Sequence, residues 1–173
     1  LFEDKMGFPK FMGDKPVTEG FMRNGYPVEL ARQRIYSGCH WLAIPGREYC
    51  MNDIIKIELG TIFEVALKDM MSDSSVEPSV QELWNRFVKH LHRGIEVLAE
   101  GIDFHLEHMH AVFPELYLDF FCYGPIEKGL DATNGGVEFY NICVDASSLA
   151  TAADSFAAIE QRVEKEKRMT WQE

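Results

Sequence analysis

The feature that most constrains the fold is a run of apolar residues at helical spacing between residues 79 and 102. Six side chains fall on one face of a helix there: Leu83, Phe87, Leu91, Ile95, Leu98 and Ile102. Ser79 and Glu82 have the separation of a capping box, so we expect the helix to begin at Ser79. Gly94 and Gly101 weaken the helix and mark contacts or a break. Because a helix with one apolar face must bury it against other elements, the pattern predicts a helix-rich packed core.

Three more segments have helical patterns: residues 26–36, 52–71 and 147–168. In the first, we expect Pro27 at the opening helical position, where its missing N–H does no harm. In the second, Asn52 or Asp53 is the expected N-cap. The third carries small and apolar residues on the side that we expect to be buried, including Phe156, and becomes charged toward its end.

Two segments have the composition of strands. Residues 115–123 are aromatic and lie between Pro114 and Gly124, which favours a buried strand, with a short helix as the alternative. Residues 137–144 follow a turn signal and favour a second strand. Residues 1–26 predict irregular structure with one short helix. This mixture of predicted helices and predicted strands indicates the α/β class, with helices dominating.

The composition is that of an acidic protein of one domain. Its 173 residues are enough for a sizeable core, and its formal net charge is −11 at pH 7. This charge argues against binding to nucleic acid or to an anionic membrane surface. No apolar run is long enough to predict a membrane span, and no signal peptide is visible. Four scattered cysteines without a Cys-x-x-Cys pair are interpreted as reduced thiols in a cytoplasmic protein.

One cysteine lies in an unusual context. Gly38 and Cys39 precede His40, and a Pro45-Gly46 turn signal follows. From the residues alone, Cys39 could be a metal ligand, a nucleophile, a radical carrier or a small buried residue. Adjacent loop residues rarely point at one another, which disfavours a hydrolytic pair of Cys39 with His40.

Histidines near residue 107 raise a metal hypothesis. The group consists of His105, Glu107, His108 and His110, and Glu107 with His110 forms a Glu-x-x-His pair. A carboxylate-bridged di-iron bundle needs two such pairs and two further glutamates, and the chain has one pair. A metal-binding helical protein is therefore the less favoured alternative, and structural or surface histidines are preferred.

A set of motifs in fixed order runs from about residue 8 to residue 171. It comprises Glu29, Ala31, Arg32 and Tyr36; the loop Gly38-Cys39 with Pro45-Gly46 and Asn52-Asp53; Lys128, Gly129 and Asp131; Gly135, Gly136, Tyr140 and Asn141; and the helix Asp154, Ser155, Phe156, Ala157, Ala158 and Ile159. Their order and spacing together resemble the glycyl radical enzymes, the relatives of pyruvate formate-lyase.

The resemblance implies a fold and a role for Cys39. Residues 1–173 would be one helix-rich section of a ten-stranded α/β barrel domain, with a Cys loop at about residues 36–52 entering the barrel centre between two packed helices. Cys39 would give its hydrogen to a backbone glycyl radical, and its thiyl radical would then abstract hydrogen from a small organic substrate. Gly38 would permit backbone torsions that a side chain forbids.

The resemblance also implies the setting of the reaction. No cofactor or metal would bind directly, because an activating enzyme of the radical S-adenosylmethionine type installs the glycyl radical. The full-length enzyme would be a homo-oligomer in anaerobic metabolism. The glycyl motif, Arg-Val-x-Gly before an aromatic residue, is absent, and Lys165 stands where its glycine would be. The glycyl radical domain would lie beyond Glu173, and the isolated chain is expected to be inactive. A rival hypothesis is a degenerate family fragment that serves as a structural or interaction module.

A second departure bears on the reaction. Many lyases of the family have a Cys-x-Glu sequence whose glutamate acts as acid or base, and this chain has Trp41 at that position. An indole suits an apolar or aromatic substrate, so carbon–carbon chemistry of the arylacetate-decarboxylase kind, or a related radical lyase or synthase, is favoured. His40 or Glu48 are the candidates to replace the missing acid or base. The single cysteine disfavours the formate-lyase reaction, an acyl transfer, because that reaction uses two adjacent cysteines.

Overall fold

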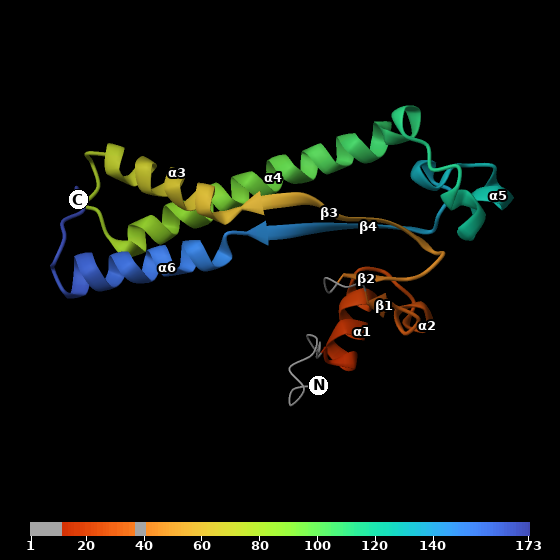
Figure 1. The fold of residues 1–173 in the computed structure, drawn as a ribbon, viewed down its shortest axis with the longest axis horizontal. Coiled ribbons are helices and arrows are strands. Elements are labelled where there is room, and N and C mark those ends of the chain that lie inside the picture. The colour runs from red at the N-terminus through yellow and green to blue at the C-terminus, as the bar shows by residue number, and fades with distance from the viewer. Residues whose placement is uncertain (1–11, 37–40) are drawn as a thin grey trace, which may run out of the picture. The chain divides into compact units, whose positions relative to one another are not determined.

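The computed structural model describes residues 12–36 and 41–173, with the backbone alone at residues 52–54. The chain divides into two compact units, Leu1–Asn52 with His108–Cys143, and Asp53–Glu107 with Val144–Glu173. β3 (Glu48–Glu58) and β4 (Phe139–Ser147) form a two-stranded sheet (Figure 1). β4 confirms the strand predicted at residues 137–144. Among the helices that the structure describes, none is long and apolar enough to cross a membrane.

Three helices build the second unit. They are α3 (Leu59–Ser72), α4 (Val80–Val112) up to Glu107, and α6 (Leu149–Ile159), which the π-helical segment η3 (Glu160–Lys165) continues (Figure 1). Leu83 and Phe87 of the predicted apolar face are buried against Met70 of α3 and Ala152 of α6. The Phe156 ring meets the Phe87 ring edge-on, with centroids 5.4 Å apart. The predicted helices at 79–102 and 147–168 are therefore confirmed.

The start of α4 follows the predicted cap in part. The Glu82 N–H donates to Ser79 Oγ at 3.1 Å, as a capping box requires. The Glu82 carboxylate, however, accepts a hydrogen bond from Arg86 Nε at 2.7 Å. α4 continues through both glycines without a break. A Cβ on Gly94 would lie 3.4 Å from Ile57 Cδ1, whereas a Cβ on Gly101 would meet nothing within 4 Å.

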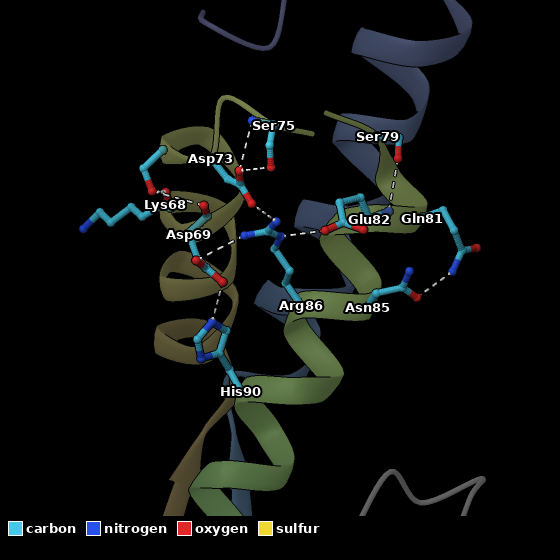
Figure 2. Close-up of polar contacts among 11 residues, drawn as sticks. Lys68, Asp69, Asp73, Ser75, Ser79, Gln81, Glu82, Asn85, Arg86 and His90 are labelled. Atoms are coloured by element: carbon cyan, nitrogen blue, oxygen red, sulfur yellow. Dashed lines mark hydrogen bonds and ion pairs between the residues drawn. The ribbon is translucent and has the colours of Figure 1, made fainter. Parts of the chain in front are cut away.

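Arg86 joins α3 to α4 through a network of charges (Figure 2). Its guanidinium lies 3.1 Å from Asp69, 2.7 Å from Asp73 and 2.7 Å from Glu82, and each contact uses a different nitrogen. His90 Nε2 lies 3.1 Å from the second oxygen of Asp69. The carboxylates come from both helices, so the network fixes the position of one helix against the other in this unit.

We expect the second unit to lose stability in acid through Asp73. Hydrogen bonds from Ser75 and Arg86 lower the pKa of Asp73 to about 2. The stabilising contribution of the ionised carboxylate is therefore full above the pKa of an unfolded aspartate, about 3.9, and is lost as the pH falls toward 2. Urea unfolding of this unit at pH 7, 4 and 2 measures the effect. Asp73→Asn should weaken the dependence of the unfolding free energy on pH. The control Asp154→Asn, at an exposed position on α6, should leave this dependence as in the wild type. Equal pH dependence in the two variants would contradict the role of Asp73.

The helix predicted at residues 52–71 is wrong in its first part. Residues 48–58 form β3, and the helix begins at Leu59, capped by Glu58, whose carboxylate accepts from the Gly60 N–H at 3.3 Å. Ile55 and Ile57 are half-buried, and Lys56 and Glu58 are exposed. This alternation has the period of a strand, and β-branched isoleucines favour the extended backbone. Neither Asn52 nor Asp53 is the cap.

The described part of the first unit begins with four short elements. These are α1 (Asp14–Arg23), α2 (Val28–Ala31), β1 (Ile35–Tyr36) and β2 (Leu42–Ala43). α1 confirms the short helix expected in residues 1–26. The helix predicted at 26–36 is too long, because it ends at Ala31 and a strand follows. Pro27 is its N-cap rather than its first helical residue. The Arg34 guanidinium donates to the Ala31 carbonyl at 2.7 Å, which pairs a carbonyl at the end of the helix, and to Thr18 Oγ1 at 3.0 Å.

The segment at residues 115–123 contains no strand. Leu118–Phe121 form the 3-10 helix η1, so the helical alternative is correct and the preferred strand is wrong. The Asp119 N–H donates to the Glu115 carbonyl at 3.2 Å, and the Asp119 carboxylate accepts from the Ala132 N–H at 2.7 Å. The first of these bonds uses a backbone N–H and a backbone carbonyl that a strand would pair with a neighbouring strand. α5 (Pro125–Lys128) and the 3-10 helix η2 (Ala132–Asn134) follow.

Candidate active site

The loop that contains Cys39 lies between two short strands and not between two helices as predicted. β1 and β2 pair antiparallel, with Ile35 opposite Ala43 and Tyr36 opposite Leu42. Both pairs are centred on position 39 of the sequence. Gly38, Cys39 and His40 themselves lie outside the described residues, so their roles stay predictions. Trp41 is the first described residue after them and is half-buried.

Glu48 is buried at the start of β3, with 6% of its surface exposed. Its Oε2 atom accepts hydrogen bonds from the Ile44 N–H at 2.8 Å, from the Cys50 thiol at 3.3 Å and from Asn141 Nδ2 at 3.4 Å. Its Oε1 atom has no hydrogen-bond partner among the described residues. Through its Oε2 atom, Glu48 therefore holds the chain that follows the Cys loop.

Asn141 connects β4 to the return strand of the loop. Its Nδ2 atom donates to the Leu42 carbonyl at 2.8 Å, in addition to the contact with Glu48. Leu42 is three residues after Cys39. The asparagine of the Gly-Gly motif thus holds the backbone beside the Cys loop.

Lys128 and the two glycines of the motif set the path of the chain into β4. The Lys128 ammonium donates to the carbonyls of Gly135, Gly136 and Val137 at 3.1, 2.8 and 3.2 Å. The carbonyls of Leu130 and Asp131 approach Gly136 so closely that a Cβ there would lie 2.4 and 2.6 Å from their oxygens. These contacts give the motif a structural role, which is to position β4 and Asn141.

Asp131 and Tyr140 complete this turn. Asp131 caps η2 by accepting from the Thr133 N–H at 2.8 Å, and its other oxygen accepts from the Glu115 N–H at 2.9 Å. The Tyr140 hydroxyl accepts from the Gly135 N–H at 2.6 Å and donates to the Ala132 carbonyl at 2.9 Å. Each of these motif residues satisfies backbone groups that a buried turn must pair.

A cavity of about 560 Å³ lies beside this cluster within the first unit. Residues of α1, the following turn, β2 and β4 line it, including Phe21, Asn24, Tyr26, Leu42, Phe139 and Asn141. The Tyr26 ring stacks on Phe139 with centroids 4.1 Å apart and meets Phe21 edge-on at 5.0 Å. Leu42 and Asn141 belong both to this wall and to the contacts that hold the loop. Tyr26 was not identified from the sequence, because nothing along the chain indicates that it meets a strand more than a hundred residues later.

We expect Cys50 to react slowly with alkylating agents. Burial, and then the adjacent charge of Glu48, raise the pKa of the Cys50 thiol to about 12. Because the thiolate is the reactive form, alkylation by iodoacetamide at pH 8 should be at least about tenfold slower in the folded protein than in urea. Peptide mass spectrometry measures the rates, and Glu48→Gln should increase the folded-state rate. An equal rate in folded and unfolded protein would contradict the described environment.

The histidine group on α4 does not assemble a metal site in the structure. His105, Glu107 and His108 are exposed, and His110 is half-buried. Over residues 12–36 and 41–173, no three side chains of histidine, cysteine, aspartate or glutamate are grouped so that they could hold a metal ion.

The fold and the motif contacts define a section of a glycyl radical enzyme barrel. The family model "Pyruvate formate lyase-like" matches residues 1–173, and the chain belongs to this family. The chain is 29% identical over 174 residues to (2S)-3-sulfopropanediol dehydratase of Klebsiella oxytoca, covering 94% of this chain and 21% of that protein.

Two solved structures share the fold. One, from work on 1,2-propanediol dehydration in Roseburia inulinivorans, superposes with a TM-score of 0.79 at 19% identity, over 98% of this chain and 22% of that one. The other, a glycyl radical enzyme of Archaeoglobus fulgidus, superposes with a TM-score of 0.74 at 19% identity, over 88% of this chain and 21% of that one. The chain thus spans about a fifth of the length of these relatives. The match to the family model and the two superpositions confirm the predicted family and fold class.

Proposed function

We propose that this chain is the Cys-loop section of a glycyl radical lyase, in which Cys39 carries the thiyl radical. The radical starts on a glycine outside residues 1–173, installed by an activating enzyme of the radical S-adenosylmethionine type. It passes to Cys39, which removes a hydrogen atom from a small organic substrate. The full-length protein works as a homo-oligomer in the cytoplasm of an anaerobic cell.

The observation that carries the proposal is the hairpin of β1 and β2. Its strand pairs, Ile35 with Ala43 and Tyr36 with Leu42, are centred on position 39 of the sequence, and this register supports Cys39 as the residue that the reaction uses. Asn141 and Glu48 hold the backbone of the return segment through Leu42 and Ile44. A radical carrier needs flanking segments that are held in place, because a misplaced radical reacts with its surroundings instead of with the substrate.

The reaction that we propose first is the elimination of water from a small hydroxylated compound. The support is the similarity to (2S)-3-sulfopropanediol dehydratase, together with the fold shared with the structure from work on 1,2-propanediol dehydration. A second candidate is carbon–carbon cleavage of the arylacetate-decarboxylase kind. Trp41 favours it, because a half-buried indole stands where lyases with a Cys-x-Glu sequence have a carboxylate.

Turnover by the full-length protein tests these alternatives. The protein, activated anaerobically, is given (2S)-3-sulfopropanediol, 1,2-propanediol and phenylacetate in separate reactions. An aldehyde from a diol supports dehydration, and carbon dioxide from phenylacetate supports the second candidate. Cys39→Ala should abolish turnover, whereas Cys122→Ala, at a half-buried cysteine in the same unit, should not. Turnover that survives in Cys39→Ala would refute the role of Cys39.

A further inference from the structure

We propose that five exposed apolar side chains of the first unit, which we call the aromatic patch, form a docking surface for another part of the full-length polypeptide. The patch consists of Leu116, Tyr117, Phe120, Phe121 and Ile126. The segment that covers it lies outside residues 1–173 and presents apolar side chains flanked by lysine or arginine. The inference rests on the family to which the chain belongs and not on the proposed reaction.

The first support is the exposure of the aromatic patch. Each of its five residues has between 65% and 78% of its surface exposed. The rings of Tyr117 and Phe121 lie 5.4 Å apart between centroids. Leu116, Phe120 and Ile126 line one hollow of about 540 Å³. A single exposed apolar residue is ordinary on a protein surface, whereas large apolar side chains gathered in one short segment mark an interaction site.

The second support is that polar groups, and not the large apolar side chains, anchor this segment. The Asp119 carboxylate accepts from the Ala132 N–H at 2.7 Å, and the Glu115 N–H donates to the Asp131 carboxylate at 2.9 Å. Pro125 is buried at the start of α5. These contacts hold η1 and α5 in place and leave the aromatic patch in water. Because burial of apolar surface is the main favourable term in folding, such a face is expected to be covered in the complete protein.

The third support identifies the occupant as part of the same polypeptide. The section described here covers 21% of (2S)-3-sulfopropanediol dehydratase and 22% of the structure from work on 1,2-propanediol dehydration, so most of each of those chains lies outside it. A surface that a transient partner uses is about as apolar as the rest of the protein, whereas permanent contacts are more apolar. The aromatic patch has the composition of a permanent contact, which a segment of the same polypeptide provides.

The charge around the patch argues against a second copy as the occupant. Residues 112–131 contain one amine, Lys128, and four carboxylates: Glu115, Asp119, Glu127 and Asp131. The Lys128 ammonium already donates to three backbone carbonyls. A two-fold contact uses the same surface on both chains, so a second copy would bring carboxylates against carboxylates, which disfavours association. A segment with lysine or arginine beside its apolar residues fits the patch instead.

The test measures the exposure of the patch in the full-length protein by hydroxyl-radical footprinting. Peptide mass spectrometry gives the oxidation rate of each side chain in the folded protein and in urea. Tyr117, Phe120 and Phe121 report on the patch without any substitution. Phe87, which is buried in the second unit, is the matched reference for a covered aromatic side chain. Leu116→Glu and Leu149→Glu make the same change at positions that are 66% and 64% exposed, the first in the patch and the second on α6.

We expect the aromatic patch to be covered in the full-length protein. Tyr117, Phe120 and Phe121 should be oxidised at least about tenfold more slowly in the folded protein than in urea, as should Phe87. Leu116→Glu should remove the protection of the patch and leave Phe87 protected, because it places a charge in an apolar contact beside existing carboxylates. The control Leu149→Glu should leave the patch protected.

Two results would overturn the inference. Less than about tenfold protection of all three aromatic side chains, with Phe87 protected, would show that no other segment covers the patch. Protection that disappears when the protein is diluted until its oligomers dissociate would identify a second copy as the occupant. Neither result concerns hydrogen transfer by Cys39, so the proposed function would stand. If Leu116→Glu fails to fold, the wild-type measurement decides the outcome alone.

Discussion

Replacing Gly136 by alanine should destabilise the first unit by about 3 kcal/mol, near the upper end of the usual cost of overpacking. The added methyl group would lie 2.4 Å from the Leu130 oxygen and 2.6 Å from the Asp131 oxygen. Both are backbone atoms. The chain can relieve the overlap only by moving the turn, and the same turn supplies carbonyls to Lys128. The substitution should therefore also displace β4 and Asn141.

The measurement is urea unfolding, followed by circular dichroism. Gly101→Ala is the matched control, because an added Cβ there meets nothing within 4 Å and the residue lies inside α4. Alanine is favoured over glycine in a helix by about 1 kcal/mol, so the control should be neutral or stabilising. Two variants of equal stability would show that the close approach at Gly136 is not a constraint on the fold.

The second large effect is expected from Leu83→Ala. Leu83 is fully buried in the second unit, where α3, α4 and α6 pack around one apolar core. Removing a buried leucine side chain costs about 2–5 kcal/mol, because its contacts are lost and a cavity remains. The loss should appear as a lower free energy of unfolding of the helical unit.

Leu149→Ala makes the same chemical change at an exposed position of α6 in the same unit. Its effect should stay within about 0.5 kcal/mol. Urea unfolding followed by tryptophan fluorescence reports on this unit through Trp84, whose ring centroid lies 5.7 Å from that of Phe87, and through Trp171, which packs against the core. A loss below about 1 kcal/mol for Leu83→Ala would contradict the packing described for the three helices.

The sequence correctly predicted those elements whose apolar residues fit only one spacing, that of a helix or that of a strand. Residues 79–102 repeat at helical spacing alone, and α4 covers them. Residues 52–58 fit two periods: Ile55 continues a helical series into α3, while Ile55, Lys56, Ile57 and Glu58 also alternate as a strand. Pairing with β4, whose residues lie about ninety positions later in the chain, favoured the strand. Such a partner cannot be read from the segment itself, because strand pairing is a tertiary interaction.

The candidate site was predictable in its motifs but not in its contacts. Lys128, Gly136 and Asn141 were identified by their spacing, yet spacing does not show that they hold a turn and the Leu42 backbone. Glu48 was identified as a candidate acid or base in the Cys loop, but its hydrogen bond with Asn141, which lies 93 positions later, has no signal in the sequence. Tyr26 had no sequence signal. Residues that meet across long stretches of chain become neighbours only when the fold is known.

The most direct test of the central claim is the exchange of the glycyl hydrogen with solvent in the full-length protein. If Cys39 and the radical glycine trade hydrogen atoms, the deuterium that a Cys39 thiol acquires in D2O will pass to the glycine. The doublet of the glycyl radical in the electron paramagnetic resonance spectrum should then collapse to a single line. The proposed role of Cys39 predicts this collapse in the wild type and a lasting doublet in Cys39→Ala. A lasting doublet in the wild type, or the same collapse in Cys39→Ala, would contradict it.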